Sequence, residues 1–226
     1  MELLVFGHAG ARVLVFPTRD GRFYEYENLR IVGSIAHKIE AGHLQLFCVD
    51  SLVHETFYCW WKRPSDRLQQ HIAFERYVLE EVFPLMDLVN PHECTIAHGC
   101  SLGAYYAGAI ALRHPHRFRK LAAFSGRYDL TEPVEWFGDL LDGFHDENVY
   151  FHMPSQFVPN LDCPEILRHL RNMDIVLVIG EEDPFLENNR RLSESLWDKG
   201  VPNSLHVWRE RAHRGYYWRR MAPLYL

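Results

Sequence analysis

The segment GCSLG at residues 99–103 carries the clearest chemical signal of the sequence. The apolar run Cys94 to His98 precedes it, and a helical pattern from Leu102 to His114 follows it. A serine lifted clear of a sheet on a tight strand-to-helix turn leaves little room for side chains beside it, which explains glycine at both flanking positions. The context predicts that Ser101 is an exposed nucleophile. An ordinary strand-to-helix turn is the alternative interpretation.

A serine hydroxyl is a weak nucleophile at neutral pH, so Ser101 would need a base and an acid that orients the base. The apolar run at residues 174–180 ends in two glutamates, Asp183 and a proline, which places carboxylates after a buried strand. Asp183 is the favoured acid and Glu182 the substitute, although either residue could simply start a helix. His213 follows the last predicted strand, where a terminal loop would return it towards the serine.

Other histidines and cysteines of the chain do not suggest a metal or cofactor. His98 directly precedes the serine turn, where we expect it to pack in the sheet or line the pocket rather than act as a base. No H-E-x-x-H or paired C-x-x-C spacing occurs, so we expect no metal site.

Acyl chemistry on a serine also needs backbone N–H groups that point at the developing oxyanion. One should belong to Leu102, which immediately follows the serine. The other should come from the loop at residues 16–23, after an early strand, where Thr18 and Arg19 are both candidates. A turn that is merely rich in polar residues is the alternative for this loop.

The elements that must position these residues alternate along the chain. Seven apolar runs are predicted strands: Leu3–Phe6, Arg12–Phe16, Leu44–Val49, Cys94–His98, Lys120–Phe124, Ile175–Ile179 and Ser204–Trp208. The clearest predicted helices are Leu29–Glu40, Arg67–Leu88, Leu102–His114 and Leu186–Lys199. Strands without polar alternation that alternate with helices indicate an α/β fold, with a mostly parallel central sheet and helices on both faces.

Residues 127–172 interrupt this alternation with four prolines and many aromatic side chains. We expect loops and short helices there, forming a cap-like insertion over the edge of the sheet where ligands bind in this fold class. Trp136, Phe137 and Tyr150 are the expected pocket wall, together with Cys100 beside the serine. Packing of an awkward corner of the core is the alternative role for the insertion.

Composition limits the classes of function. The 226 residues suit a single domain, 1–226, and the hydrophobic fraction of 47% excludes a disordered chain. A net charge of −6 gives no attraction for nucleic acid or anionic lipid, and no apolar run is long enough to span a bilayer. Five cysteines without paired spacing and the lack of a secretory signal favour a cytoplasmic location.

Six segments in this order resemble the putative esterase (esterase D-like) family of α/β-hydrolases: FPTRDGRFYEYEN, LQLFCVDS, AFERYVLEEVFP, HGCSLGAYYA, GEEDPFLENNRRLS and AHRGYYW. The chain order of Ser101, Asp183 and His213 is also the one expected of an α/β-hydrolase. The resemblance implies a serine carboxylesterase that acts on a small-molecule ester, with Ser101 as nucleophile, Asp183 as orienting acid and His213 as general base. It implies no cofactor.

The chain departs from the family pattern in two places. Relatives usually continue the histidine with an acidic residue and a tryptophan, whereas Arg214 and Gly215 follow His213 here. Relatives also tend to begin with one more strand, so the outermost N-terminal strand is expected to be missing, and the exposed edge would allow a homo-oligomer. An acyltransferase of the same fold and a non-catalytic binding or scaffold protein are the alternative functions.

Overall fold

The computed structural model describes all residues, 1–226, and is built on one seven-stranded sheet in the order β1-β3-β2-β4-β5-β6-β7. The strands are β1 Leu3–Phe6, β2 Ala11–Phe16, β3 Leu44–Val49, β4 Thr95–Cys100, β5 Lys120–Phe124, β6 Asp174–Gly180 and β7 Ser204–Trp208. Only β1 runs antiparallel to its neighbour, β3, and every other pair is parallel. The predicted α/β class and mostly parallel sheet are confirmed.

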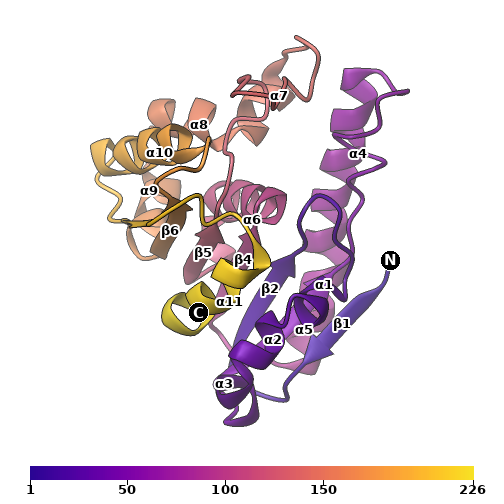
Figure 1. Cartoon of the computed structure of the whole chain (residues 1–226), viewed down its shortest axis with the longest axis vertical. Coiled ribbons are helices and arrows are strands. Elements are labelled where there is room, and N and C mark those ends of the chain that lie inside the picture. The colour runs from indigo at the N-terminus through magenta and orange to yellow at the C-terminus, as the bar shows by residue number, and fades with distance from the viewer.

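Helices cover both faces of this sheet (Figure 1). They are α1 Glu25–Asn28, α2 Ile31–Ser34, α3 Ala36–Glu40, α4 Pro64–Tyr77, α5 Phe83–Val89, α6 Leu102–Arg113, α7 Glu147–His152, α8 Pro154–Phe157, α9 Pro164–Arg171, α10 Leu186–Asp198 and α11 Gly215–Tyr225. None of them combines the length and apolarity that crossing a bilayer requires.

Two predicted helices differ from the observed ones. The region predicted as one helix, Leu29–Glu40, divides into α2 and α3, and Arg30 before α2 takes a left-handed conformation with φ of 57°. The region predicted as Arg67–Leu88 begins earlier and contains a π-helical turn, Val78–Val82, between α4 and α5. Pro84 lies just after this turn, and the wider π turn relieves the clash of its ring with the preceding carbonyls.

Alternate side chains of the strands enter two separate cores, one on each face. Leu14 and Phe16 of β2 belong to a cluster of 40 buried residues that includes α4, α5, α6 and α10. Val13 and Val15 of the same strand belong to a cluster of 19 buried residues with α2, α3 and α11. Burial on both faces explains why these strands lack polar alternation.

The segment at residues 127–172 connects β5 to β6 through loops, α7, α8, a short 3-10 turn at Val158–Asn160, and α9. Figure 1 shows α7 and α8 beyond the end of the sheet towards which β2 points, with α4 rising across from them. This segment therefore contributes to the end of the molecule where the parallel strands finish.

Candidate active site

Ser101 occupies the single residue between β4 and α6. Its backbone has φ of 56° and ψ of −122°, a conformation that is costly for a residue with a side chain. The turn is held because the Ser101 N–H donates to the carbonyl of Phe124 on the neighbouring β5 at 2.8 Å. The observed geometry is the strained turn that the GCSLG segment predicts.

The two glycines of the segment permit close backbone approaches. A Cβ on Gly99 would lie 2.2 Å from the carbonyl of Gly103, and a Cβ on Gly103 would lie 2.2 Å from the carbonyl oxygen of Phe16. Neither backbone contact can be relieved by moving a flexible side chain. Glycine is therefore required at both positions for the turn to sit against β2.

Ser101, His213 and Asp183 form a continuous hydrogen-bonded chain. The His213 Nε2 lies 2.9 Å from the Ser101 Oγ, and the His213 Nδ1 lies 2.7 Å from the Asp183 Oδ2. A carboxylate only accepts, so Nδ1 carries the proton and Nε2 is free to accept the serine hydroxyl. The arrangement has the donor and acceptor sense of a nucleophile, a base and an orienting acid.

Asp183 is fixed by burial and by a second hydrogen bond. Its side chain is fully buried, and its other oxygen, Oδ1, accepts the backbone N–H of Phe185 at 3.0 Å. Glu182, the substitute acid, is exposed and makes no contact with His213. The loop that returns His213 approaches closely, since a Cβ on Gly180 would lie 2.0 Å from the carbonyl oxygen of Arg211.

Two aromatic rings lie close to the His213 imidazole. The Phe185 ring lies 6.1 Å from it between centroids and the Trp218 ring 5.7 Å, the latter in an edge-on arrangement. The Trp218 Nε1 donates to the Ser125 hydroxyl at 3.1 Å, which fixes the indole. Sequence reasoning missed both rings. The sequence places a tryptophan five residues after His213, where helix α11 brings it back.

The two candidate donors on the early loop differ in availability. The Thr18 N–H donates to the Glu25 carboxylate at 2.8 Å, so it is already used. The Arg19 N–H has no partner in the protein, and neither has the N–H of Leu102 at the start of α6. Of the two loop residues, the structure therefore leaves only Arg19 with a free N–H.

A cavity of about 210 Å³ opens over Ser101 and His213. Its lining residues come from the segments that follow β2, β3, β4, β5, β6 and β7: Thr18, Arg19, Asp20, Tyr58, Ser101, Leu102, Arg127, Leu130, Phe137, Leu140, Phe185, His213 and Trp218. The lining is mixed, with seven hydrophobic residues and two arginines, Arg19 and Arg127. Of the expected wall residues, Phe137 lies in this cavity.

The other three expected wall residues lie elsewhere. Cys100 is buried on the opposite side of β4, where its Sγ lies 3.3 Å from the Tyr26 hydroxyl, because neighbouring strand residues face opposite sides of a sheet. Trp136 is 69% exposed and stacks with the Arg211 guanidinium instead. Tyr150 packs against the larger core cluster.

His98 is buried within the sheet and does not face the cavity. Its Nδ1 contacts the carbonyl of Ala122, while its Nε2 is enclosed without a partner. Burial lowers the pKa of His98 to about 4, so the ring is neutral at physiological pH. It has no contact with Ser101, in agreement with the expectation that it is not the base.

A second cluster of ionisable residues lies between α4, α6 and α7. His71, Glu75 and His152 come within 4.8 Å of one another, a spacing that invites comparison with a metal site. Arg113, however, donates to both Glu75 oxygens at 2.7 and 2.8 Å and also contacts His152. Burial raises the pKa of Glu75, but the hydrogen bond from His114 and the charge of Arg113 outweigh this effect and lower the pKa to about 2. The cluster is thus an ion network in which arginine supplies the cation.

A family model described as "Putative esterase" matches residues 38–221. Among solved structures, a ferulic acid esterase is 16% identical, covering 94% of this chain and 81% of its own, with a TM-score of 0.72. An S-formylglutathione hydrolase from Agrobacterium tumefaciens is also 16% identical, covering 97% and 85%, with a TM-score of 0.72.

An S-formylglutathione hydrolase from Staphylococcus aureus is 14% identical and covers 96% of this chain and 79% of its own, with a TM-score of 0.64. Similarity at this level of identity shows a shared fold. Among curated proteins, none matches the chain significantly in sequence.

Proposed function

Because the chain belongs to the putative esterase family of α/β-hydrolases, we propose that it is a serine carboxylesterase that hydrolyses small acyl esters through an acyl-enzyme on Ser101. The observation that carries the proposal is the chain of contacts from Ser101 through His213 to the buried Asp183, at 2.9 and 2.7 Å. These are hydrogen-bond distances suited to proton transfer.

In the first half-reaction, the Ser101 Oγ attacks the ester carbonyl carbon while the His213 Nε2 takes the hydroxyl proton. The resulting tetrahedral oxyanion is stabilised by the backbone N–H groups of Leu102 and Arg19, which the protein leaves unpaired. When the C–O bond of the ester breaks, His213 returns the proton to the departing alcohol. The acyl group then remains bound to Ser101 as an ester.

In the second half-reaction, His213 takes a proton from a water molecule while the water oxygen attacks the acyl carbon. Collapse of the second tetrahedral intermediate returns the proton to the Ser101 Oγ and releases the carboxylic acid. Asp183 stays ionised throughout, holding the imidazole in its Nδ1–H tautomer and stabilising the imidazolium that forms in both halves. No further group is needed to balance either step.

The same geometry weighs against a scaffold without catalytic activity. Such a protein would retain the three residue types with their side chains misplaced, whereas here every donor faces an acceptor. Water and an alcohol would attack the acyl-enzyme by the same route, so analysis of products formed with added alcohols separates hydrolysis from acyl transfer.

The direct test is hydrolysis of p-nitrophenyl acetate by purified wild-type protein and by Ser101→Ala. We expect the substitution to lower kcat/KM by a factor of about 10³ or more, because it removes the nucleophile. Ser195→Ala is the matched control, since this hydroxyl lies on α10 and bonds only to the Arg191 carbonyl. Full hydrolysis by Ser101→Ala would refute the proposal.

A further inference from the structure

Arg127 is a buried cation that has no carboxylate partner. The residue is only 5% exposed, and its guanidinium is held by backbone carbonyls. The Nε donates to the backbone carbonyl of Asp129 at 3.0 Å. The Nη2 donates to the backbone carbonyls of Glu132 at 2.6 Å and Gly138 at 2.9 Å. Buried arginines usually pair with an acid, because carbonyl dipoles orient a charge without neutralising it.

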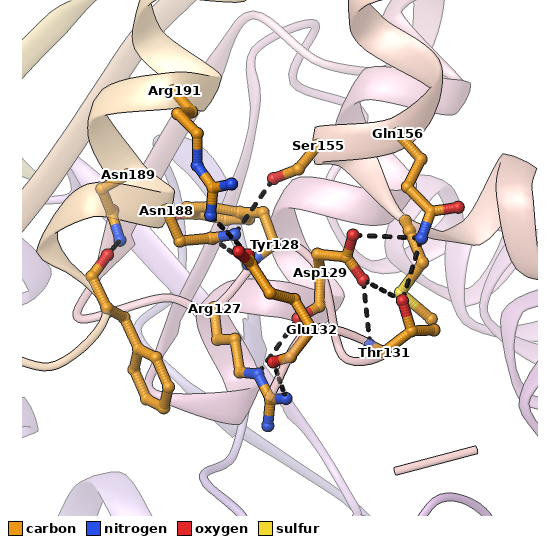
Figure 2. A network of polar contacts seen from close by, with 12 residues as sticks. Arg127, Tyr128, Asp129, Thr131, Glu132, Ser155, Gln156, Asn188, Asn189 and Arg191 are labelled. Atoms are coloured by element: carbon orange, nitrogen blue, oxygen red, sulfur yellow. Dashed lines mark hydrogen bonds and ion pairs between the residues drawn. The ribbon is translucent and has the colours of Figure 1, made fainter. Parts of the chain in front are cut away.

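One nitrogen of this guanidinium remains unused. The Arg127 Nη1 makes no hydrogen bond within the protein, and it is not among the fully enclosed atoms that lack a partner. Figure 2 shows the guanidinium at the margin of its polar network, with one terminal nitrogen turned away from the other labelled residues. Since Arg127 lines the cavity over Ser101, this nitrogen is the part of the residue available to a bound molecule.

The chain fixes Arg127 near the reacting atoms. It lies three residues after Phe124, so its Cα is at most roughly 11 Å from the Cα of Phe124, whose carbonyl accepts the Ser101 N–H. The Phe185 ring links the two groups, because it lies 5.7 Å from the Arg127 guanidinium and 6.1 Å from the His213 ring. Ser101, His213 and Arg127 also line the same cavity of about 210 Å³, so a molecule that fills the cavity at Ser101 can contact Arg127.

The charge balance of the cavity favours an anion. The one acidic residue that lines the cavity is Asp20, which is already paired with the half-exposed Arg19 at 3.0 Å. Desolvation lowers the pKa of Arg127, which shows that burial costs the charged form, yet an arginine stays protonated at physiological pH. The carboxylates of Asp129, Glu132 and Asp139 favour the charged guanidinium electrostatically, but none forms an ion pair with it, so a negative group that reached Nη1 would be its direct ionic partner.

We propose that Arg127 binds a carboxylate group of the substrate, so that the preferred esters carry a carboxylate a few bonds from the scissile ester. The inference rests on the proposed esterase function of the same cavity. Guanidinium donors suit carboxylate acceptors, and a charge-assisted hydrogen bond in a partly desolvated site discriminates strongly against a neutral group.

A purely structural role for Arg127 leads to a different expectation. The residue ties together the loop that begins the 127–172 segment, and Figure 2 shows that loop joined to α8 and α10 by further polar contacts. If this were the only role, replacing Arg127 would affect charged and neutral esters equally. The test therefore measures a ratio between matched substrates.

Two pairs of esters place the carboxylate on either side of the scissile bond. Monomethyl glutarate carries it on the acyl side, and methyl 5-oxohexanoate replaces it with a methyl ketone. The acetate ester 4-acetoxybutyrate carries it on the alcohol side, with 5-acetoxypentan-2-one as its neutral match. We expect wild-type kcat/KM to favour the carboxylate in at least one pair by about tenfold or more, mainly through KM.

Variants then assign the preference to Arg127. Arg127→Gln should reduce the ratio to near one, whereas Arg191→Gln should preserve it. Arg191 is a fair control because it is an exposed arginine of the same network, paired with the Glu132 side chain outside the cavity. Retention of the full ratio by a folded Arg127→Gln protein would overturn the proposal.

Wild-type protein gives a second test should Arg127→Gln fail to fold. Glutarate, but not glutaramide, should inhibit hydrolysis of methyl 5-oxohexanoate competitively. Equal rates within both ester pairs, together with no inhibition by glutarate, would overturn the carboxylate site and leave the esterase function intact.

Failure of the esterase function itself would look different. Wild-type protein would then hydrolyse none of the four esters. Calorimetric titration of Ser101→Ala with glutarate and with glutaramide still tests the site, because it requires no catalysis. Binding of glutarate alone would support the carboxylate site, and no difference between the two ligands would contradict it.

Discussion

Glu25 accepts the backbone N–H of Thr18 at 2.8 Å and also the Thr18 hydroxyl, which pins the loop after β2 to helix α1. The N–H of the next residue, Arg19, has no partner, and Arg19 lines the same cavity as Ser101. The position of one proposed oxyanion donor thus depends on a carboxylate that does not line the cavity.

Substituting Glu25 should therefore affect the chemical step. In Glu25→Gln the amide oxygen can replace one of the two hydrogen bonds, and the charge is lost. We expect kcat to fall about tenfold with little change in KM, because a displaced donor weakens transition-state binding. Steady-state kinetics on p-nitrophenyl acetate measures both constants.

Glu27→Gln is the matched control for this substitution, since Glu27 is exposed on the same helix. Its kinetics should equal those of the wild type. Identical kcat values for Glu25→Gln and the wild type would show that the Thr18 contact does not position the donor.

Gly103 provides a test of the packing behind the serine turn. A Cβ there would lie 2.2 Å from the Phe16 carbonyl oxygen, so Gly103→Ala should lower the free energy of unfolding by about 2 kcal/mol or more. Gly33→Ala is the control, because a Cβ on this exposed helical residue meets nothing within 4 Å. It should stabilise the protein by about 0.5–1 kcal/mol.

Urea unfolding of the two glycine variants measures both effects. Equal stabilities of Gly103→Ala and Gly33→Ala would mean that the turn tolerates a side chain, contrary to the observed contact with β2.

Asp183 should affect catalysis by fixing the tautomer of His213 rather than by contributing to substrate binding. In Asp183→Asn the amide can donate to Nδ1, which would move the histidine proton to Nε2 and remove the acceptor for the serine hydroxyl. We expect kcat to fall by a factor of about 10³ to 10⁴. Glu182→Asn should retain wild-type kcat, since Glu182 makes no contact with the imidazole. The opposite order of effects would identify Glu182 as the acid.

Burial of His98 predicts a dependence of stability on pH. Its pKa is about 4 in the folded protein and about 6.5 in an unfolded chain, so between these values the unfolded state binds the extra proton. The contribution of His98 to the free energy of unfolding is therefore fully present above about pH 6.5 and is lost as the pH falls towards 4. The contribution of His98 to this loss should be about 3 kcal/mol.

His98→Gln should reduce the loss of unfolding free energy between pH 7 and pH 4 by about that amount. His54→Gln is the control, because His54 is exposed and should leave the pH dependence unchanged. An unaltered dependence in His98→Gln would contradict the assignment, and denaturant titrations at several pH values provide the comparison.

The pattern of apolar residues in the sequence is sufficient to predict the fold and the loops that meet at Ser101. The seven predicted strands match the observed ones to within two residues, because runs of buried apolar residues are visible in the sequence. Ser101, Asp183 and His213 each follow a strand, and the carboxyl ends of parallel strands lie at one edge of the sheet. The structure brings these three residues together as that rule requires.

Side-chain direction was harder to predict. Cys100 neighbours Ser101 yet faces the other side of β4, and Trp136 neighbours Phe137 yet points to solvent. Local sequence does not specify which member of such a pair enters a cavity. The free nitrogen of Arg127 depends likewise on carbonyls that only the folded loop brings together.

The central claim is that Ser101 is an activated nucleophile, and labelling with a fluorophosphonate followed by intact-mass measurement tests it most directly. We expect one adduct per wild-type chain, located on Ser101, and none on Ser101→Ala. Absence of an adduct on folded wild-type protein, or an adduct of equal yield on Ser101→Ala, would contradict the claim.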